Sequence, residues 1–159
     1  MPRAGRNRRG VTLIELLIVV SIAGAMVAIA LPTFAAGLEN IRLSQASDGV
    51  ASFLNTALNR VERREQVMEI TISPRDNLIL LRSADGAFSR KLTLPDGVLV
   101  DAVLPKLPQD TGVLRRFLLL PGASAPRIGV QLTNRRGQRR IVSLDPITGV
   151  PSIERPATP

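Results

Sequence analysis

The chain has 159 residues and contains no cysteine, histidine, tryptophan or tyrosine. Without cysteine it has neither a disulfide nor a thiolate metal site, and without histidine it has no Ser-His-Asp triad and no imidazole ligand. Its glycines form neither a P-loop nor a dinucleotide-binding fingerprint. Four aspartates stand in turn-like sequences, where a carboxylate bonds to nearby backbone: Asp76, Asp85, Asp96 and Asp145. We therefore expect a protein that is not an enzyme and that has no cofactor and no metal site.

Negative charge is missing from the first ten residues, which carry four arginines: Arg3, Arg6, Arg8 and Arg9. Removing this segment lowers the formal net charge from +8 to +4. Basic residues beside an apolar run stay on the cytoplasmic side of a membrane. Much of the positive charge therefore belongs to a leader segment at 1–10, and the net charge alone does not indicate nucleic-acid binding.

An apolar run follows the leader and extends from Leu16 to Leu38, interrupted only by small or hydroxyl-bearing residues and Pro32. About 20 such residues, at ~1.5 Å rise each, cross a bilayer as a helix. One carboxylate, Glu15, stands at its head. A charged side chain inside a membrane helix costs about 3 kcal/mol at the helix centre. We therefore expect Glu15 to have a partner or a function.

The junction between leader and apolar run reads Gly10 followed by Val-Thr-Leu-Ile-Glu-Leu-Leu-Ile-Val. It resembles the class III signal of type IV pilins and type II secretion pseudopilins, with Val11 where phenylalanine or methionine is usual. The resemblance implies that a prepilin peptidase cleaves after Gly10 and methylates the new amino terminus of Val11. It also implies that Glu15 pairs with the terminal amine of its own or a neighbouring subunit and so sets the register of assembly.

A cleaved secretory signal peptide has a similar outline, with a basic start, an apolar centre and small residues such as Ala23, Ala25 and Ala28. However, the apolar run is too long for that class, contains Glu15 and continues into a helical pattern without a break. We therefore favour the pilin-type interpretation.

The pattern predicts one long helix over 11–66, with a first half that is apolar on all sides and an amphipathic second half. In the second half, apolar residues recur at the spacing of one helix face: Val50, Phe53, Leu54, Ala57, Leu58 and Val61. We expect 11–38 to be the transmembrane and assembly segment. Residues 39–159 then form a β-rich domain that includes the second half of the helix, 39–66.

After Gln66 the apolar period changes to about two, which is typical of strands. Strands are predicted at 67–73, 78–82, 88–94, 98–104, 115–120, 127–133 and 138–144. Short turns rich in Pro, Asp, Asn and Gly separate most of them, so the ladders are antiparallel. The loop 105–112 is long enough to cross between sheets, and we expect the proline-rich tail 151–159 to be frayed. The fold class is α+β: a long helix packed on an antiparallel β-sheet domain.

Three C-terminal segments, 94–98, 116–122 and 137–149, resemble the GspH/FimT family of minor pseudopilins and minor pilins. This resemblance implies a single-pass bacterial inner-membrane protein with its C-terminal domain in the periplasm. Its partners are then other pilin-like subunits in a helical fibre, the prepilin peptidase and the inner-membrane assembly platform. The leading hypothesis is a minor pseudopilin of the type II secretion system.

Four arginines flank Gly137 within six residues of a predicted hairpin: Arg135, Arg136, Arg139 and Arg140. Such a cluster contacts phosphates in a salt-dependent, sequence-independent way, but no aromatic residue is interleaved to stack bases. On the FimT side of the family, a basic C-terminal patch is associated with DNA capture during natural transformation. A DNA-binding minor type IV pilin is therefore the alternative function. A solvated basic hairpin, or one that pairs with acidic neighbours in a filament, is the simpler interpretation. A membrane-anchored periplasmic protein unrelated to fibres is a third hypothesis.

Overall fold

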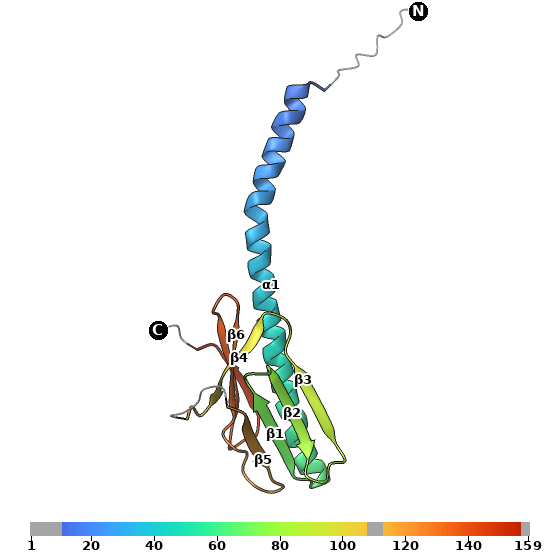
Figure 1. The fold of residues 1–159 in the computed structure, drawn as a ribbon, viewed down its shortest axis with the longest axis vertical. Coiled ribbons are helices and arrows are strands. Elements are labelled where there is room, and N and C mark those ends of the chain that lie inside the picture. Colours follow the sequence, from blue (N-terminus) through green and yellow to red (C-terminus); the bar gives the residue numbers. More distant parts are fainter. Residues whose placement is uncertain (1–10, 108–112, 157–159) are drawn as a thin grey trace, which may run out of the picture. The chain divides into compact units, whose positions relative to one another are not determined.

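The protein is described from a computed structural model, which covers residues 11–107 and 113–156 and, for residues 32–36, the backbone only. Within these residues, one helix precedes eight strands (Figure 1). The chain divides into two units, with the boundary between Gly37 and Leu38. The predicted α+β class is confirmed.

Helix α1 extends from Leu13 to Arg64, two residues shorter at each end than predicted. It ends there because Glu65 adopts a left-handed backbone conformation, with φ of 51°. The part Leu13–Leu31 is long and apolar enough to span a membrane, and none of it is buried against the rest of the described chain. The helical backbone continues through Pro32.

The eight strands form two four-stranded sheets, and neighbouring strands in each sheet are antiparallel. The first sheet has the order β3 (Ser89–Thr93), β2 (Leu78–Ser83), β1 (Met68–Ser73) and β5 (Arg115–Leu119). The second sheet has the order β4 (Val98–Leu104), β6 (Gly129–Asn134), β7 (Arg139–Leu144) and β8 (Pro151–Glu154).

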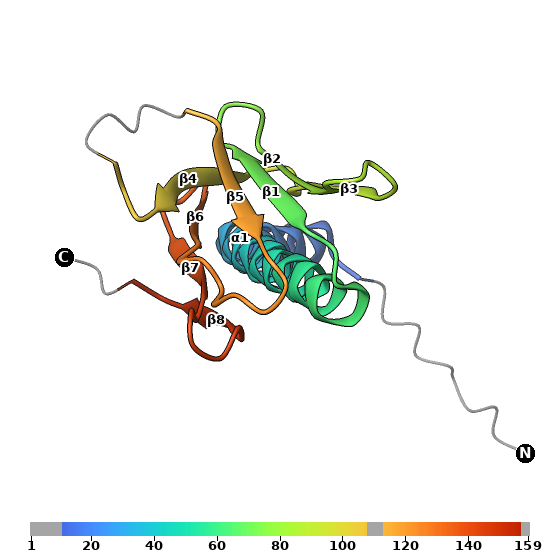
Figure 2. The ribbon, with the colours of Figure 1, turned by 90° about the horizontal axis from the view of Figure 1, so that it is seen from below.

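The C-terminal half of α1 lies in the angle between the two sheets (Figure 2). Its buried side chains continue the stripe predicted from the helical spacing: Leu43, Ala46, Val50, Phe53, Leu54, Ala57 and Val61. Leu58, also predicted on this stripe, is half-buried. Side chains from both sheets, including Ile70, Ile79, Val130 and Val142, complete the core. One apolar stripe on the helix therefore holds both sheets together.

The two sheets are also joined at the outer edge of β4. In the turn between β1 and β2, the Asn77 side chain donates a hydrogen bond to the Val98 carbonyl (2.8 Å) and accepts one from the Val100 amide (2.9 Å). Near the other end of β4, Arg115 Nη1 donates to the carbonyls of Val103 (3.2 Å) and Pro105 (2.8 Å). A turn residue and a strand residue of the first sheet thus bond to three backbone groups of β4: the carbonyls of Val98 and Val103 and the amide of Val100.

The segment 105–112 connects β4 of the second sheet to β5 of the first, as its predicted length allows, although 108–112 lie outside the described residues. The prediction of a frayed tail is wrong for its first part, because Pro151–Glu154 forms β8 and pairs with β7. A turn returns the chain, with the Asp145 amide donating to the Val150 carbonyl (3.2 Å) and the Gly149 amide donating to the Asp145 carbonyl (2.9 Å).

Candidate functional site

The N-terminal candidate site begins at Val11, since Gly10 lies outside the described residues. The hydroxyl of Thr12 accepts a hydrogen bond from the Glu15 amide (3.3 Å), and the Thr12 carbonyl accepts one from the Leu16 amide (3.2 Å). Thr12 is therefore the N-cap of α1, and Glu15 occupies the third helical position, where its amide and not its carboxylate makes the capping bond. The spacing of Thr12 and Glu15 fixes where the helix begins.

The Glu15 carboxylate lies in the first turn of α1, where the positive end of the helix dipole favours an anion. It has neither an ion pair nor a hydrogen bond with any residue that the structure describes. The apolar side chains around it are exposed, among them Leu13 (83%) and Ile14 (67%). This end of the helix therefore presents one carboxylate, without a partner among the described residues, on a largely apolar surface.

The second candidate site is the hairpin between β6 and β7, which carries the arginine cluster. Asn134 is buried and organises the turn: its Oδ1 accepts hydrogen bonds from the amides of Arg136 (3.1 Å) and Gln138 (3.0 Å). Its own carbonyl accepts one from the Gly137 amide (3.0 Å), and Gly137 has φ of 75°, which favours glycine. The predicted hairpin around Gly137 is present and its turn is well ordered by these bonds.

The four arginines do not form one surface. Arg139 and Arg140 are adjacent on β7 and therefore point to opposite faces of the second sheet. Arg139 Nε lies 3.4 Å from Asp101 Oδ2, whereas Arg140 Nη1 donates a hydrogen bond to Ser44 Oγ on α1 (3.1 Å). Both strand arginines are thus engaged in contacts within the domain.

The other two arginines, Arg135 and Arg136, are exposed in the turn. Arg135 lies beside Gly97, because a Cβ atom added to Gly97 would be 3.3 Å from Arg135 Nε. The same added atom would be 3.3 Å from Glu39 Oε2, so this carboxylate of α1 and the Arg135 guanidinium flank one glycine. Glu39 Oε2 is buried and accepts no hydrogen bond from a described residue.

The sequence did not identify the acidic neighbours of this cluster. Asp101 lies where the pairing of β4 with β6 shifts by one residue, and it also accepts a hydrogen bond from Gln131 Nε2. Glu39 is the second residue of the C-terminal unit. Both carboxylates are far from the arginines along the chain, so no local spacing could have indicated these contacts. For Asp101, its position as a lone carboxylate in an apolar strand could have indicated that it has a partner.

Two turn aspartates have lowered pKa values because neutral donors bind their charged form. The Ser83 hydroxyl and then the Ala87 amide lower the pKa of Asp85, and the amides of Ile147 and Thr148 lower that of Asp145. Among the described residues, no group of three or more Asp, Glu, His or Cys could hold a metal ion. These carboxylates stabilise their own turns.

Comparison with known proteins bears on the N-terminal segment. No curated protein and no solved structure matches the chain. Residues 5–31 match a family model described as the prokaryotic N-terminal methylation motif. The match spans the basic leader, Gly10, Thr12, Glu15 and the first part of the apolar helix. The N-terminal segment is therefore a type IV pilin-like prepilin signal, and together with the apolar helix it is consistent with single-pass membrane anchoring.

Proposed function

We propose that the protein is a structural subunit of a pilin-type fibre, and specifically a minor pseudopilin of a type II secretion system. In this proposal a prepilin peptidase cleaves after Gly10 and methylates Val11. Until assembly, the helix anchors the chain in the bacterial inner membrane with 39–159 in the periplasm. The N-terminal methylation motif and the α+β fold support the fibre class, and the GspH/FimT resemblance supports the minor role.

The observation that carries the proposal is the carboxylate of Glu15, which has no partner among the described residues, at the head of an exposed apolar helix. In a medium of low dielectric constant, an uncompensated anion is costly and a nearby ammonium stabilises it strongly. Cleavage after Gly10 places a new ammonium group on Val11, four residues from Glu15. In the membrane the exposed apolar side chains of the helix contact lipid, and in the fibre they contact neighbouring helices. Moving the subunit from membrane to fibre therefore keeps this apolar surface covered.

The experiment that tests this function is the intact mass and N-terminal sequence of the membrane-extracted chain from cells with and without prepilin peptidase. We expect a chain that begins at Val11 only when the peptidase is present, and no cleavage in a Gly10→Val variant. An uncleaved wild-type chain, or cleavage near Ala28, contradicts the proposal.

The role of Glu15 is tested separately with the isosteric Glu15→Gln variant. We expect normal cleavage but reduced co-purification with fibre subunits, because the neutral side chain no longer pairs with an ammonium group. Glu62→Gln, which changes an exposed carboxylate on the same helix, is the matched control and should assemble as wild type. If Glu15→Gln assembles as well as Glu62→Gln, the register role is wrong.

The alternative function is a minor type IV pilin that binds DNA through the basic hairpin. Four arginines lie within six residues at this hairpin, and three of the four arginines are exposed, which favours this alternative. Because Arg139 and Arg140 contact Asp101 and Ser44, replacing all four would also disturb the domain. The variant Arg135→Gln with Arg136→Gln changes the two arginines of the turn and keeps the contacts of Arg139 and Arg140 with Asp101 and Ser44. If wild-type protein causes a salt-dependent mobility shift of duplex DNA and this variant weakens the shift, DNA binding is supported. If wild-type protein causes no shift of DNA even at low salt, the DNA-binding alternative is wrong.

A further inference from the structure

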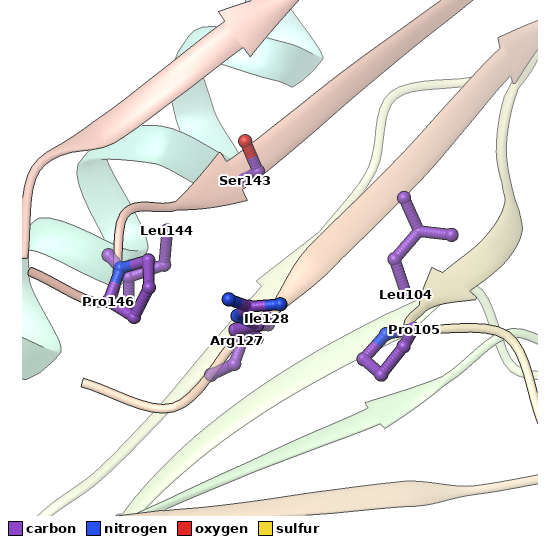
Figure 3. A pocket seen from close by; sticks show the side chains of 7 residues that line it. All are labelled: Leu104, Pro105, Arg127, Ile128, Ser143, Leu144 and Pro146. Carbon is purple, nitrogen blue, oxygen red and sulfur yellow. The ribbon is translucent and has the colours of Figure 1, made fainter. Parts of the chain in front are cut away.

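The second sheet carries a pocket that neither candidate site uses. It has a volume of 330 Å³ and lies between the end of β4, the residues leading into β6 and the end of β7 (Figure 3). Its lining residues are Leu104, Pro105, Arg127, Ile128, Ser143, Leu144 and Pro146. This volume is at the lower end of the range of about 300–1,000 Å³ that is usual for ligand pockets. The hollow is large enough for an aliphatic side chain.

The walls of the pocket are apolar except at two positions. Ser143 Oγ is already paired with Ser152 Oγ of β8 at 2.9 Å. Arg127 is exposed and has no ion pair, hydrogen bond or ring contact with any residue that the structure describes. In Figure 3 its side chain lies with Ile128 between Pro146 on one side and Pro105 on the other. The pocket therefore combines an apolar hollow with one positive charge that has no partner among the described residues.

Two other charged residues stand beside lining residues. Asp145 carries a negative charge between two of them, but it forms no ion pair with Arg127, and its Oδ1 accepts hydrogen bonds from the amides of Ile147 (2.7 Å) and Thr148 (3.2 Å). Arg115 donates to the carbonyl of the lining residue Pro105 at 2.8 Å. Arg127 is therefore the lining residue that can receive an anionic ligand group.

We propose that this pocket is the docking site for a segment of another polypeptide in which a large aliphatic side chain stands next to a carboxylate. The aliphatic group fills the hollow between Leu104, Ile128 and Leu144, and the carboxylate pairs with Arg127. Charge complementarity selects this occupant, because a purely apolar segment would leave the guanidinium unpaired at the contact and a basic one would be repelled. The proposal goes beyond the fibre function, and its test requires neither leader cleavage nor assembly.

Because the chain has no cysteine, a single introduced thiol can report on the pocket. Ile147 follows the lining residue Pro146 and is 93% exposed, so Ile147→Cys places a thiol at the rim without changing the lining. The full-length variant in lipid nanodiscs is equilibrated under mild reductant with capped peptides of sequence Cys-Gly-Leu-Asp, Cys-Gly-Leu-Asn and Cys-Gly-Ala-Asp. The fraction of each mixed disulfide, measured by intact mass, reports how well the peptide is held.

We expect the Leu-Asp peptide to be captured about two- to fivefold more than the Leu-Asn peptide, the range for one exposed ion pair. We expect it also to be captured more than the Ala-Asp peptide, since only leucine fills the hollow. Adding Arg127→Glu should reverse the preference between Asp and Asn, and this reversal cannot arise from unfolding. Arg75→Glu, an exposed arginine in the turn between β1 and β2, is the matched control and should leave the preference unchanged.

Equal capture of the three peptides overturns the proposal, and so does a preference for Asp that persists in the Arg127→Glu variant. If the Ile147→Cys chain forms disulfide-linked dimers in preference to peptide adducts, the occupant is a second copy of the chain, and the proposal of a different polypeptide is wrong. Reversal of the preference in the Arg127→Glu variant, without such dimers, supports it.

Discussion

Replacing Asn77 should weaken the connection between the two sheets by a predictable amount. Its side chain makes two hydrogen bonds to β4, at 2.8 and 2.9 Å, and each is worth about 1 kcal/mol. Asn77 also has φ of 51°, a conformation that costs most residues other than glycine about 1 kcal/mol. Asn77→Gly should therefore lower the free energy of unfolding by about 2 kcal/mol and Asn77→Ala by about 3 kcal/mol.

The assay is urea unfolding of the full-length chain in nanodiscs, followed by circular dichroism because the chain has no tryptophan or tyrosine. Hydrogen exchange with mass spectrometry adds a local readout at the Val100 amide, the partner of Asn77 Oδ1. A loss of 2 kcal/mol corresponds to about thirtyfold faster exchange where exchange requires opening of the domain.

The control for backbone strain is Glu65, which has the same φ of 51° at the end of α1. Glu65→Gly should stabilise the domain by about 1 kcal/mol, because glycine is preferred in this conformation after a helix. If Asn77→Gly costs less than about 0.5 kcal/mol, or if exchange at Val100 stays as slow as in wild type, the side-chain bridge does not hold the sheets together.

Gly129→Ala should destabilise the domain by about 1–3 kcal/mol, because the added Cβ would lie 2.8 Å from Leu104 Cβ. In Gly49→Ala the added Cβ meets no atom within 4 Å, so this variant should stabilise α1 by about 1 kcal/mol. Thermal unfolding distinguishes the two variants, and equal shifts in their melting temperatures would contradict the packing argument. The pKa of Asp85 is lowered below its ordinary value of 3.8, first by the Ser83 hydroxyl, so its stabilisation is present above that value and is lost as the pH falls through the folded-state pKa. The stability difference between wild type and Asp85→Asn should therefore shrink between about pH 5 and pH 2 in urea titrations, and a difference that is constant over this range would refute the assignment.

The helix and most strands could be predicted because burial on one face leaves a local period in the sequence. Strand β8 was missed because its Pro-Ser-Ile-Glu sequence is short and carries only two apolar residues. The sequence indicates a turn at Asp145, and the hydrogen bond from the Asp145 amide to the Val150 carbonyl closes it. A strand after this turn was not predicted. A turn signal therefore predicts a returning strand better than the strand's own composition does.

The partition into two sheets was not predictable from local patterns. The pairing of β1 with β5 places Met68 opposite Leu119, although strands of both sheets lie between them in the sequence. No short-range feature of the sequence encodes that register. The arginine cluster illustrates the same limit at a candidate site. Closeness in sequence suggested one surface, but a strand alternates its faces, so Arg139 and Arg140 separate and find partners as distant as Ser44.

The closed edge of β4 also bears on solubility. Unpaired strand edges recruit strands from other molecules and are frequent starting points for aggregation. Val98, Val100 and Val103 form part of such an edge, and side chains from the first sheet occupy their backbone groups. Loss of the Asn77 side-chain amide would therefore expose a valine-rich strand edge as well as weaken the fold. Cells that express such a variant should accumulate inclusion bodies even while the purified protein can still fold.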